Sequence, residues 1–416
     1  MVLRQVQKKR QKEGIRLKRI LMLGGNHFQM TATLAARELG YYIIDVDYLP
    51  DNPAHRFADE YHNISTIEKE KVLEKARTLN IDGIVSYASD ISAPTAAYVA
   101  EALDLPTNTY DSVMILTHKD RFRSFLKEHG FPVPRSESFT AEEYPEALSF
   151  FSELGENAIV KPVDSSGSKG VDRVTSTTGL RMAWEEALSY SISGRVILEE
   201  FIPKKGYQID GDIFIVDGKI RFWGICDQHH DHSCAPFAPV AHSFPSTQAE
   251  EYQNKAKEQL QRLLELLHIR MGACNVEYII GPDEEIYFME IGPRNGGNLI
   301  ADTIKAATSV DMAAYTVKQA TGEDCSDLKQ LPAHTCVSSY ILHTDRDGIF
   351  RGISVSPEIQ DRILKQLVFV KEGDRVHRFQ NGGFGIGAII LRFDDPVQMC
   401  DMIDHMNEFL SVIVET

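Results

Sequence analysis

The stretch from Cys274 to Asn295 constrains the fold most, because two β-rich runs flank a Gly-Pro-Asp turn at 281–283. This pattern predicts an antiparallel hairpin that brings Glu277 and Glu290 to about the same height. Carboxylates among apolar neighbours are costly to bury unpaired, so the two acids could share a cation, with Arg294 nearby to meet an anion. Alternatively, the hairpin faces solvent and its polar and apolar residues simply alternate. The spacing leaves both interpretations open.

The bulk composition excludes several classes of protein. A chain of 416 residues can form two or three domains without disulfides. Its six cysteines are scattered, which predicts reduced thiols and a cytoplasmic location. The formal net charge of −16 argues against nucleic acid or an anionic membrane as the main partner. No apolar run approaches the ~20 residues of a membrane span. The basic stretch 1–19 is expected to be a solvated extension or short helix, with a nucleic-acid-binding arm as the alternative.

The first hundred or so residues have the pattern of a parallel α/β sheet. A strand at 20–23 ends in a Gly-Gly-Asn turn, and a helix at 31–39 and a strand at 41–47 follow. The glycines do not complete a dinucleotide-binding fingerprint. Gly25 and Asn26 are predicted either to hold a substrate carboxylate or phosphate, or to form a turn needed only for packing.

The alternation of helices and strands then continues. A helix at 67–79, a strand at 83–87 and a helix at 93–103 are predicted before a break near Tyr110. Further on, we expect helices at 250–267, 304–320 and 396–409, and short strands after residue 331. The glycine-rich patch at 381–387 is interpreted as turn chemistry, since no buried lysine accompanies it.

Two lysines and a loop of small residues in the middle of the chain indicate an anion site. Lys119 begins an amphipathic helix, and Lys161 lies in an apolar strand at 158–162, where a lysine is costly without an anion to neutralise. The loop at 165–170 can wrap backbone N–H groups around phosphate oxygens, and a second strand is expected after it. It lacks the ending of a Walker loop. An ordinary hairpin turn is the alternative.

The order of these motifs along the chain resembles the ATP-grasp superfamily, above all its carboxylate–amine ligases and the synthetase modules of biotin carboxylase and carbamoyl-phosphate synthase. Each motif is modestly specific, but the collinear order is highly specific. The resemblance covers nearly the whole chain. The residues that carry it are Lys119, Lys161, Ser165–Gly170, Glu199, Glu200, Phe201, Ile202, Glu277, Glu290 and Arg294.

The resemblance implies a multidomain fold of mixed α/β and α+β class. A Rossmann-like domain is expected at 20–112 and an ATP-grasp domain at 113–330, with a lid subdomain at about 132–203. A small β-rich C-terminal domain is expected at 331–416.

The resemblance also implies an ATP site. Both lysines contact the phosphates, and the loop with Ser166, Gly167, Ser168 and Gly170 closes over them. Glu199 stands at the adenine amino group, and the backbone of Glu200 and Ile202 contacts the base. The ribose is met by Gln208, Asp210 or Asp212.

The metal end of the implied site departs from the family pattern at one position. Glu277 and Glu290 match carboxylates that hold two Mg²⁺ ions, for which Mn²⁺ is an alternative. Arg294 matches an arginine that steadies the transferring phosphoryl group. The family form is Glu-x-Asn-x-Arg, and here its asparagine is replaced by Gly292. Asn295 or a water is therefore expected to complete the second metal.

The resemblance implies an enzyme that activates a small-molecule carboxylate as an acyl phosphate, which an amine then attacks. Three alternatives stay open: a bicarbonate-dependent carboxylating or carbamoylating enzyme, a small-molecule kinase, and a nucleotide-binding regulatory protein without catalysis. The segment at 226–234 is expected to rim the active site, where His229 or His230 would contact an anionic substrate. No zinc spacing fits this segment, and a hydrated loop is the alternative. A homodimer is implied, because related enzymes are often dimers.

Overall fold

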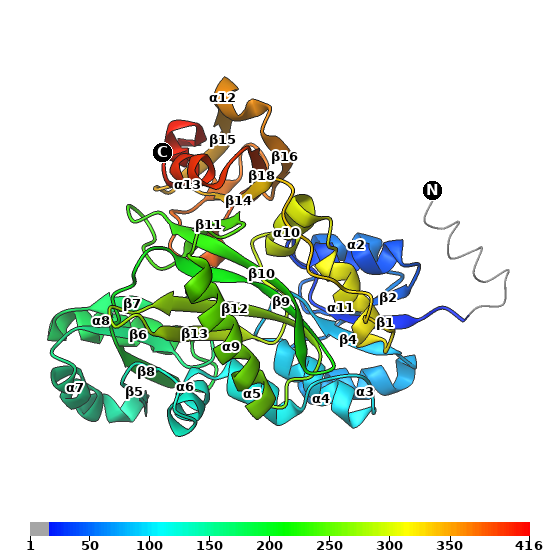
Figure 1. Ribbon diagram of the computed structural model, residues 1–416, viewed down its shortest axis with the longest axis horizontal. Helices are drawn as coiled ribbons and strands as arrows, with labels where there is room; N and C mark the ends of the chain where they lie inside the picture. The colour runs from blue at the N-terminus through cyan, green and yellow to red at the C-terminus, as the bar shows by residue number, and fades with distance from the viewer. Residues whose placement is uncertain (1–15) are drawn as a thin grey trace.

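The computed structural model describes residues 16–416. The predicted basic extension at 1–19 therefore lies mostly outside the described residues. Figure 1 shows the first sheet on the right, the lid at the lower left and the C-terminal strands at the top. None of the helices within residues 16–416 is long and apolar enough to cross a membrane.

The first sheet is parallel and has the order β3-β2-β1-β4, which confirms the predicted βαβ opening. Successive residues of β1 face opposite sides, because side chains alternate along a strand. Ile20 packs toward α2, whereas Leu21 packs toward α3 and α4. The elements of this region are β1 (Arg19–Leu23), α2 (Met30–Glu38), β2 (Tyr42–Asp47), η1 (Pro53–Phe57), β3 (Glu60–Asn63), α3 (Lys69–Leu79), β4 (Gly83–Ser86) and α4 (Ala93–Ala102).

The segment predicted as the lid subdomain, called the lid from here on, forms an antiparallel sheet of order β5-β8-β6-β7 with its own apolar core around Phe151 and Trp184. A strand, not a helix, follows the small-residue loop, as predicted. The elements before and within the lid are α5 (Tyr110–Thr117), α6 (Lys119–Glu128), β5 (Ser136–Thr140), η2 (Ala141–Glu143), α7 (Tyr144–Glu153), β6 (Ala158–Pro162), β7 (Asp172–Val174), α8 (Thr177–Tyr190) and β8 (Arg195–Glu200).

The central sheet has the order β13-β12-β9-β10-β11-β14-β18-β16. It continues from the middle of the chain into the C-terminal region, because β11 pairs with β14. The domain boundaries themselves stay predictions. The strands of this sheet are β9 (Gln208–Val216), β10 (Lys219–His230), β11 (Pro239–Phe244), β12 (Gly272–Ile280), β13 (Ile286–Gly292), β14 (Cys336–Leu342), β16 (Ile363–Val368) and β18 (Gly387–Phe393).

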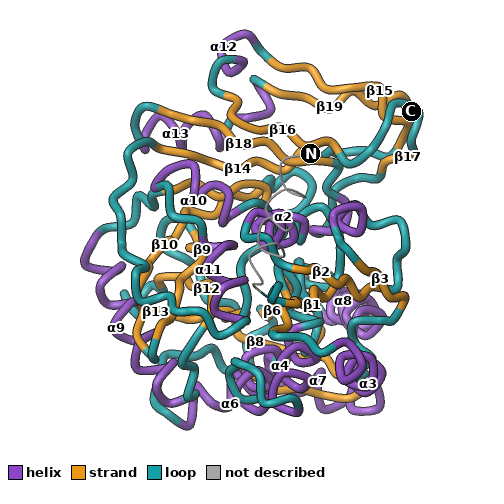
Figure 2. Tube along the Cα trace, turned by 90° about the vertical axis from the view of Figure 1, so that its right-hand side faces the viewer, coloured by secondary structure: helices purple, strands orange, loops and turns teal. Residues whose placement is uncertain are grey.

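A smaller antiparallel sheet, β17-β15-β19, lies at the C-terminal end of the molecule, at the top of Figure 2. The predicted final helix at 396–409 is shorter than expected, since α13 ends at Asp404 and a 3-10 turn follows. The remaining C-terminal elements are β15 (Gly348–Val355), α12 (Pro357–Gln360), β17 (Arg375–Val376), η3 (Gly382–Phe384), α13 (Pro396–Asp404), η4 (Met406–Glu408) and β19 (Leu410–Glu415).

The predicted helix at 250–267 is confirmed as α9 (Glu250–Leu266), but the prediction of one helix over 304–320 is wrong. The structure has two helices there, α10 (Ile300–Thr308) and α11 (Met312–Ala320). Ser309 adopts a left-handed φ of +68°, which ends the first helix. The side chain of Asp311 then accepts a hydrogen bond from Ala314 N and caps the second.

Candidate functional site

A cavity of about 670 Å³ lies between the lid, the β12–β13 hairpin and the loops that follow β1 and β4. It brings together residues that are far apart in the sequence. The predicted site residues that line it are Asn26, Lys119, Lys161, Ser166, Gly167, Ser168, Glu199, Glu200, Ile202, Gln208, Asp210, His230, Glu277, Glu290 and Arg294. The predicted residues Gly25, Gly170, Asp212, His229 and Asn295 do not line it.

Three carboxylates lie on one wall of the cavity, two from the β12–β13 hairpin and one from β9. Glu277 lies directly opposite Glu290, as predicted, and opposite Asp210 on the other neighbouring strand, β9. Burial raises the pKa of Glu277 to about 8, and the negative charges of Asp210 and Glu290 add to the increase. These carboxylates repel one another, and their oxygen atoms are the ligands that a hard divalent cation such as Mg²⁺ prefers.

Three cations lie near this acidic wall, and two of them, Lys119 and Lys161, line the cavity. The Nζ atom of Lys161 is 2.6 Å from Glu199 Oε2, and Nε of Arg123 is 2.8 Å from Glu199 Oε1. Lys119 donates a hydrogen bond to the carbonyl of Ser165 at 2.7 Å, and its Nζ is 3.7 Å from Glu290 Oε2. The buried group formed by Arg123, Lys161 and Glu199 carries two positive charges and one negative charge, so it favours an anion.

Glu199 is the acid of this group, and its two carboxylate oxygens form ion pairs with Arg123 and Lys161. Burial acts to raise its pKa, but the charges of Arg123 and Lys161 outweigh burial and hold the pKa at about 2. The sequence interpretation missed Arg123. Its signal was its position on the buried face of α6, four residues after Lys119.

The small-residue loop reaches the cavity in a conformation that needs left-handed residues. Gly167, Ser168 and Gly170 have φ of +69°, +59° and +66°. Ser168 Oγ donates to the carbonyl of Phe237 at 2.8 Å, and the backbone N–H of Gly382 donates to the carbonyl of Gly167 at 3.0 Å. The glycine-rich patch at 381–387 is thus a turn, and it also lies against the loop over the cavity. Gly170 packs against α8, where a Cβ would lie 3.0 Å from Ala187 Cα.

The end of β8 forms another wall of the cavity. Glu200 is half-buried and its carboxylate is 3.3 Å from Arg135 Nε. Ile202 follows after the strand and lines the cavity together with Lys204. Gln208, at the start of β9, donates a hydrogen bond to the carboxylate of Glu277. Phe201 and Ile202 contribute apolar surface to this wall, of the kind against which an aromatic base packs.

Arg294 follows β13 and pairs with Asp90, a residue that the sequence interpretation missed. Its Nη2 donates to Asp90 Oδ2, and its Nη1 donates to the carbonyl of Asn295 at 3.1 Å. Asp90 lies in the loop after β4, so the pair joins the first sheet to the hairpin. No sequence signal pointed to this contact, because the two residues are 204 positions apart.

Asn295 does not reach the cavity. Its side chain is fully buried, its Nδ2 donates to Asp212 at 3.0 Å, and its Oδ1 accepts from Thr316 Oγ1 at 2.6 Å. Both ends of the carboxamide are therefore used inside the protein. The geometry does not support the expectation that Asn295 completes a second metal site.

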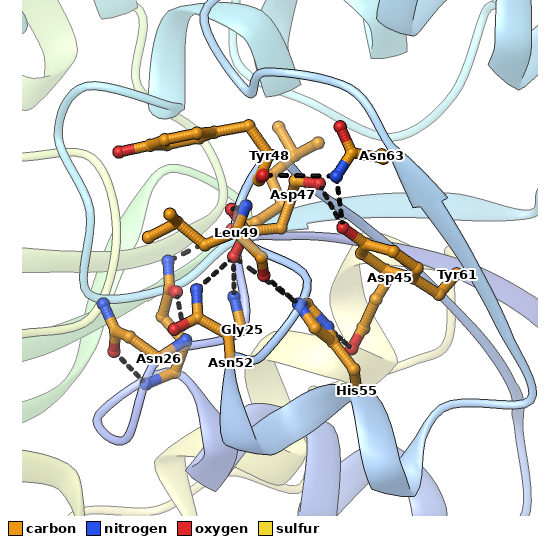
Figure 3. A network of polar contacts seen from close by, with 12 residues as sticks. Gly25, Asn26, Asp45, Asp47, Tyr48, Leu49, Asn52, His55, Tyr61 and Asn63 are labelled. Atoms are coloured by element: carbon orange, nitrogen blue, oxygen red, sulfur yellow. Dashed lines mark hydrogen bonds and ion pairs between the residues drawn. The ribbon is translucent and has the colours of Figure 1, made fainter. Parts of the chain in front are cut away.

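Gly25 lies in a partly buried polar network at the end of the first sheet, shown in Figure 3. Its N–H donates to Asp47 Oδ2 at 3.0 Å, and a Cβ on Gly25 would lie 2.4 Å from the ring of His55. His55 Nδ1 is 3.0 Å from Asp45 Oδ2. This arrangement favours the packing interpretation of Gly25, whereas Asn26 faces the cavity.

The two adjacent histidines of the 226–234 segment point to different surroundings. His229 is buried, with its ring nitrogens 2.6 Å from Asp404 Oδ1 and 2.9 Å from Ser243 Oγ. His230 lines the cavity. Burial, with the nearby charge of Lys204, lowers the pKa of His230 well below its ordinary value, so its ring is neutral at pH 7.

Of the histidine, aspartate and cysteine side chains in the 226–234 segment, only two lie close enough to each other and to a third residue to share a metal ion. Ligand atoms of Asp231, Cys234 and the distant His343 lie within 4.8 Å of one another. His343 Nε2 and Asp231 Oδ2 are 3.1 Å apart and form an ion pair. This pair accounts for the closeness of the two side chains without a metal ion. All six cysteines are buried and unpaired.

Comparison with known proteins places this cavity in a family context. A family model described as the ATP-grasp domain matches residues 124–307. The chain is 26% identical over 297 residues to the carbamoyl phosphate synthase large chain of Vibrio parahaemolyticus, covering 70% of this chain and 27% of that relative. It is 26% identical over 286 residues to the formate-dependent phosphoribosylglycinamide formyltransferase of Rhodococcus jostii, covering 66% and 68%. The chain therefore spans about a quarter of the carbamoyl phosphate synthase large chain.

Solved structures share the fold over nearly the whole chain. An L-amino acid ligase from Bacillus licheniformis superimposes with a TM-score of 0.79 at 19% identity, covering 96% of this chain and 100% of that one. A phosphoribosylglycinamide synthetase from Anaerococcus prevotii does so with a TM-score of 0.72 at 21% identity, again covering 96% and 100%. These likenesses confirm the predicted multidomain α/β and α+β architecture.

Proposed function

We propose, from the premise that this chain belongs to the ATP-grasp superfamily, that it is an ATP-dependent ligase joining a small-molecule carboxylate to an amine. One observation carries the proposal: a single cavity has buried cations on one wall and three carboxylates on the other. That charge arrangement suits a polyphosphate held between basic side chains and a divalent cation. The solved structures named above include an L-amino acid ligase and a phosphoribosylglycinamide synthetase, which supports the same class of reaction.

In the proposed reaction, an oxygen of the substrate carboxylate attacks the γ-phosphorus of ATP, and the bond to the β-phosphate oxygen breaks. The products are ADP and an acyl phosphate. The amine then attacks the acyl carbon and loses a proton, and inorganic phosphate leaves. The protein supplies positioning and charge rather than a covalent nucleophile.

The cavity walls divide these tasks. Lys119 and Lys161 would meet the ATP phosphates under the loop at 165–170, and the wall around Phe201 and Ile202 would take the base. Glu277 and Glu290 would hold Mg²⁺ or Mn²⁺, which neutralises phosphoryl charge when bound. Arg294 lies beyond them, within reach of an acyl phosphate.

The end of the cavity away from the proposed base site leaves room for the carboxylate and the amine. Asn26 and residues 88–91 line that end and belong to loops at the carboxyl edge of the first sheet. Ligands of open parallel sheets bind outside the carboxyl ends of their strands. We therefore place the carboxylate and the amine between these loops and Arg294.

An assay of ADP release tests the function directly. Amino acids and small carboxylates are screened with and without amines, and ADP formation is expected to require one partner of each kind. Binding of ATP without turnover on any pair would contradict a ligase. Dependence on bicarbonate alone would support the carboxylating alternative, and dependence on a hydroxyl compound alone a kinase. Glu290→Ala should abolish turnover in a ligase but leave a regulatory function intact.

The proposal extends to assembly and location. We expect a cytoplasmic homodimer with the domain division at 20–112, 113–330 and 331–416. The six buried, unpaired cysteines suit a reducing compartment. Light scattering coupled to gel filtration measures the mass, and a monomer across micromolar concentrations would contradict the dimer.

A further inference from the structure

Gly292 leaves a gap in the acidic wall of the cavity. Residues two apart on a strand share a face, so a side chain at position 292 would point to the cavity beside Glu290. Gly292 lies directly opposite Asn275 on β12, two residues along from the pair of Glu277 and Glu290. Glycine provides no oxygen ligand at this place. A cation held by Glu290 would therefore lack a ligand from the next inward-facing position of β13.

The side chain of Asp90 occupies the space that glycine leaves. A Cβ on Gly292 would lie 2.5 Å from Asp90 Oδ1 and 2.8 Å from Arg294 Cζ. Asp90 comes from the loop after β4 and lines the same cavity as Glu290. The glycine is therefore required by the approach of the Asp90 carboxylate, and any larger residue would displace it.

One oxygen of Asp90 is buried without a hydrogen-bond partner. Asp90 is 8% exposed, and its Oδ2 accepts a hydrogen bond from Arg294 Nη2. Its Oδ1 accepts no hydrogen bond from any residue of the described part of the chain. A buried carboxylate oxygen left unpaired costs free energy, which a bound cation would recover.

We propose that Asp90 replaces the missing side chain at position 292 and, together with Glu290, holds a divalent cation on the nucleotide. This inference rests on the proposed function, because Mg²⁺ is commonly bound through one or two carboxylates and the phosphates of a nucleotide. The metal ligand Asp90 would then come from the loop after β4 of the first sheet. Arg294 would keep its contact with the other oxygen of Asp90, so the same residue positions the arginine.

Asn275 is the structural rival for this role. It faces Gly292 across the hairpin and lines the cavity. Its Nδ2 already donates to Asp210 Oδ1 at 2.7 Å, which ties the carboxamide to β9. Asn295 is excluded by its internal hydrogen bonds to Asp212 and Thr316.

The test measures Mn²⁺ binding by electron paramagnetic resonance, with the full chain and a non-hydrolysable ATP analogue. Asp90→Ala is expected to weaken Mn²⁺ binding about 10-fold or more, as loss of a ligand or its support does, whereas Asn275→Ala is not. Gly292→Asn alone should also weaken it, because the new side chain collides with Asp90 and Arg294. The double variant Asp90→Ala/Gly292→Asn should bind Mn²⁺ more tightly than either single variant, because each change removes the defect of the other.

The outcomes separate this inference from the proposed function. If the unaltered protein binds neither the analogue nor Mn²⁺, the proposed function fails and this inference fails with it. If it binds both, and Asp90→Ala leaves the Mn²⁺ affinity unchanged, only the inference is overturned. If Asn275→Ala loses Mn²⁺ affinity and Asp90→Ala does not, the metal ligand is Asn275 and the inference is also overturned. Asp90→Ser serves in the same comparison if Asp90→Ala does not fold, which circular dichroism shows.

Discussion

At the scale of single residues, the cavity is built from charges that are buried in mutually compensating groups. Arg123, Lys161 and Glu199 are at most 6% exposed, and each would be costly alone. The attraction between them offsets desolvation only while all partners are present. Glu199 therefore has a structural role in addition to any contact with a nucleotide.

The first prediction concerns Glu199→Gln. It should lower the free energy of unfolding by about 3–5 kcal/mol, because two buried cations lose their counter-charge. Urea denaturation measures the change. Glu200→Gln is the matched control, since Glu200 pairs with the exposed Arg135, and it should cost less than about 1 kcal/mol. Equal losses in the two variants would contradict the buried group.

The same residue predicts a pH dependence. The folded-state pKa of Glu199 is about 2, below its ordinary value of 4.5. Its contribution to stability is therefore fully present above pH 4.5 and is lost as the pH falls through about 2. The difference between the unaltered protein and Glu199→Gln should shrink across that window. A difference independent of pH would rule out this ion pairing.

Asp45 should show the opposite dependence. Burial raises its pKa from 3.8 to about 6, against the opposing contribution of His55. The folded state keeps the proton up to about pH 6 while the unfolded state loses it near 3.8, so stability falls as the pH rises through this window. Asp45→Asn should not show this fall, which is on the order of 3 kcal/mol at most. Thermal unfolding from pH 4 to 7.5 compares the two proteins.

At the scale of elements, the loop at 165–170 is held over the cavity by segments from elsewhere in the chain. Phe237 and Gly382 both contact it through backbone groups. Its left-handed residues make the conformation costly in isolation. These two contacts therefore help to keep the loop closed over the cavity.

The prediction for this loop concerns Gly382→Pro. Proline removes the N–H that donates to the carbonyl of Gly167, so hydrogen–deuterium exchange in residues 165–170 should increase and the KM for ATP should rise. Gly382→Ala keeps the N–H, and its Cβ would lie 3.5 Å from the nearest atom, an ordinary contact. The alanine variant should behave like the unaltered protein. Identical exchange in both variants would show that this hydrogen bond does not hold the loop.

At the scale of the whole molecule, one apolar core joins the first sheet to the C-terminal region. Its members run from Ile20 to Leu410 and include Ile304 on α10. The hydrogen bond from Thr31 to Asp302 at 2.9 Å ties α2 to α10. Since Asp90 reaches the hairpin from the first sheet, the cavity depends on this shared packing.

The prediction at this scale is that Ile304→Ala destabilises both the first sheet and the C-terminal region. The side chain is fully buried, so its truncation should cost about 2–5 kcal/mol. Hydrogen–deuterium exchange should show reduced protection in both β1 and β14. Val397→Ala is the control, because that apolar side chain is 75% exposed and should change stability by less than about 0.5 kcal/mol. Loss of protection confined to one of these strands would argue for independent cores.

Much of the site could be predicted because it depends on local patterns. The pairing of Glu277 with Glu290 follows from a hairpin with a short turn, and the burial of Lys161 follows from apolar neighbours in its strand. The single helix predicted over 304–320 was wrong, because apolar periodicity does not report the left-handed conformation of Ser309. Asn295 was a reasonable candidate by spacing, but its carboxamide turned to Asp212 inside the protein.

The amino-acid sequence by itself determined the order of the motifs, the strands and helices that carry them, and the chemical class of the cavity. These features depend on residues close together in the chain, where side-chain alternation and turn chemistry act directly. Only the tertiary structure decided which side chains share the cavity: Arg123 beside Glu199, Gly382 against the loop, and Asp90 in the space left by Gly292. The physical reason is that these contacts depend on how separately formed elements pack, which no local spacing encodes.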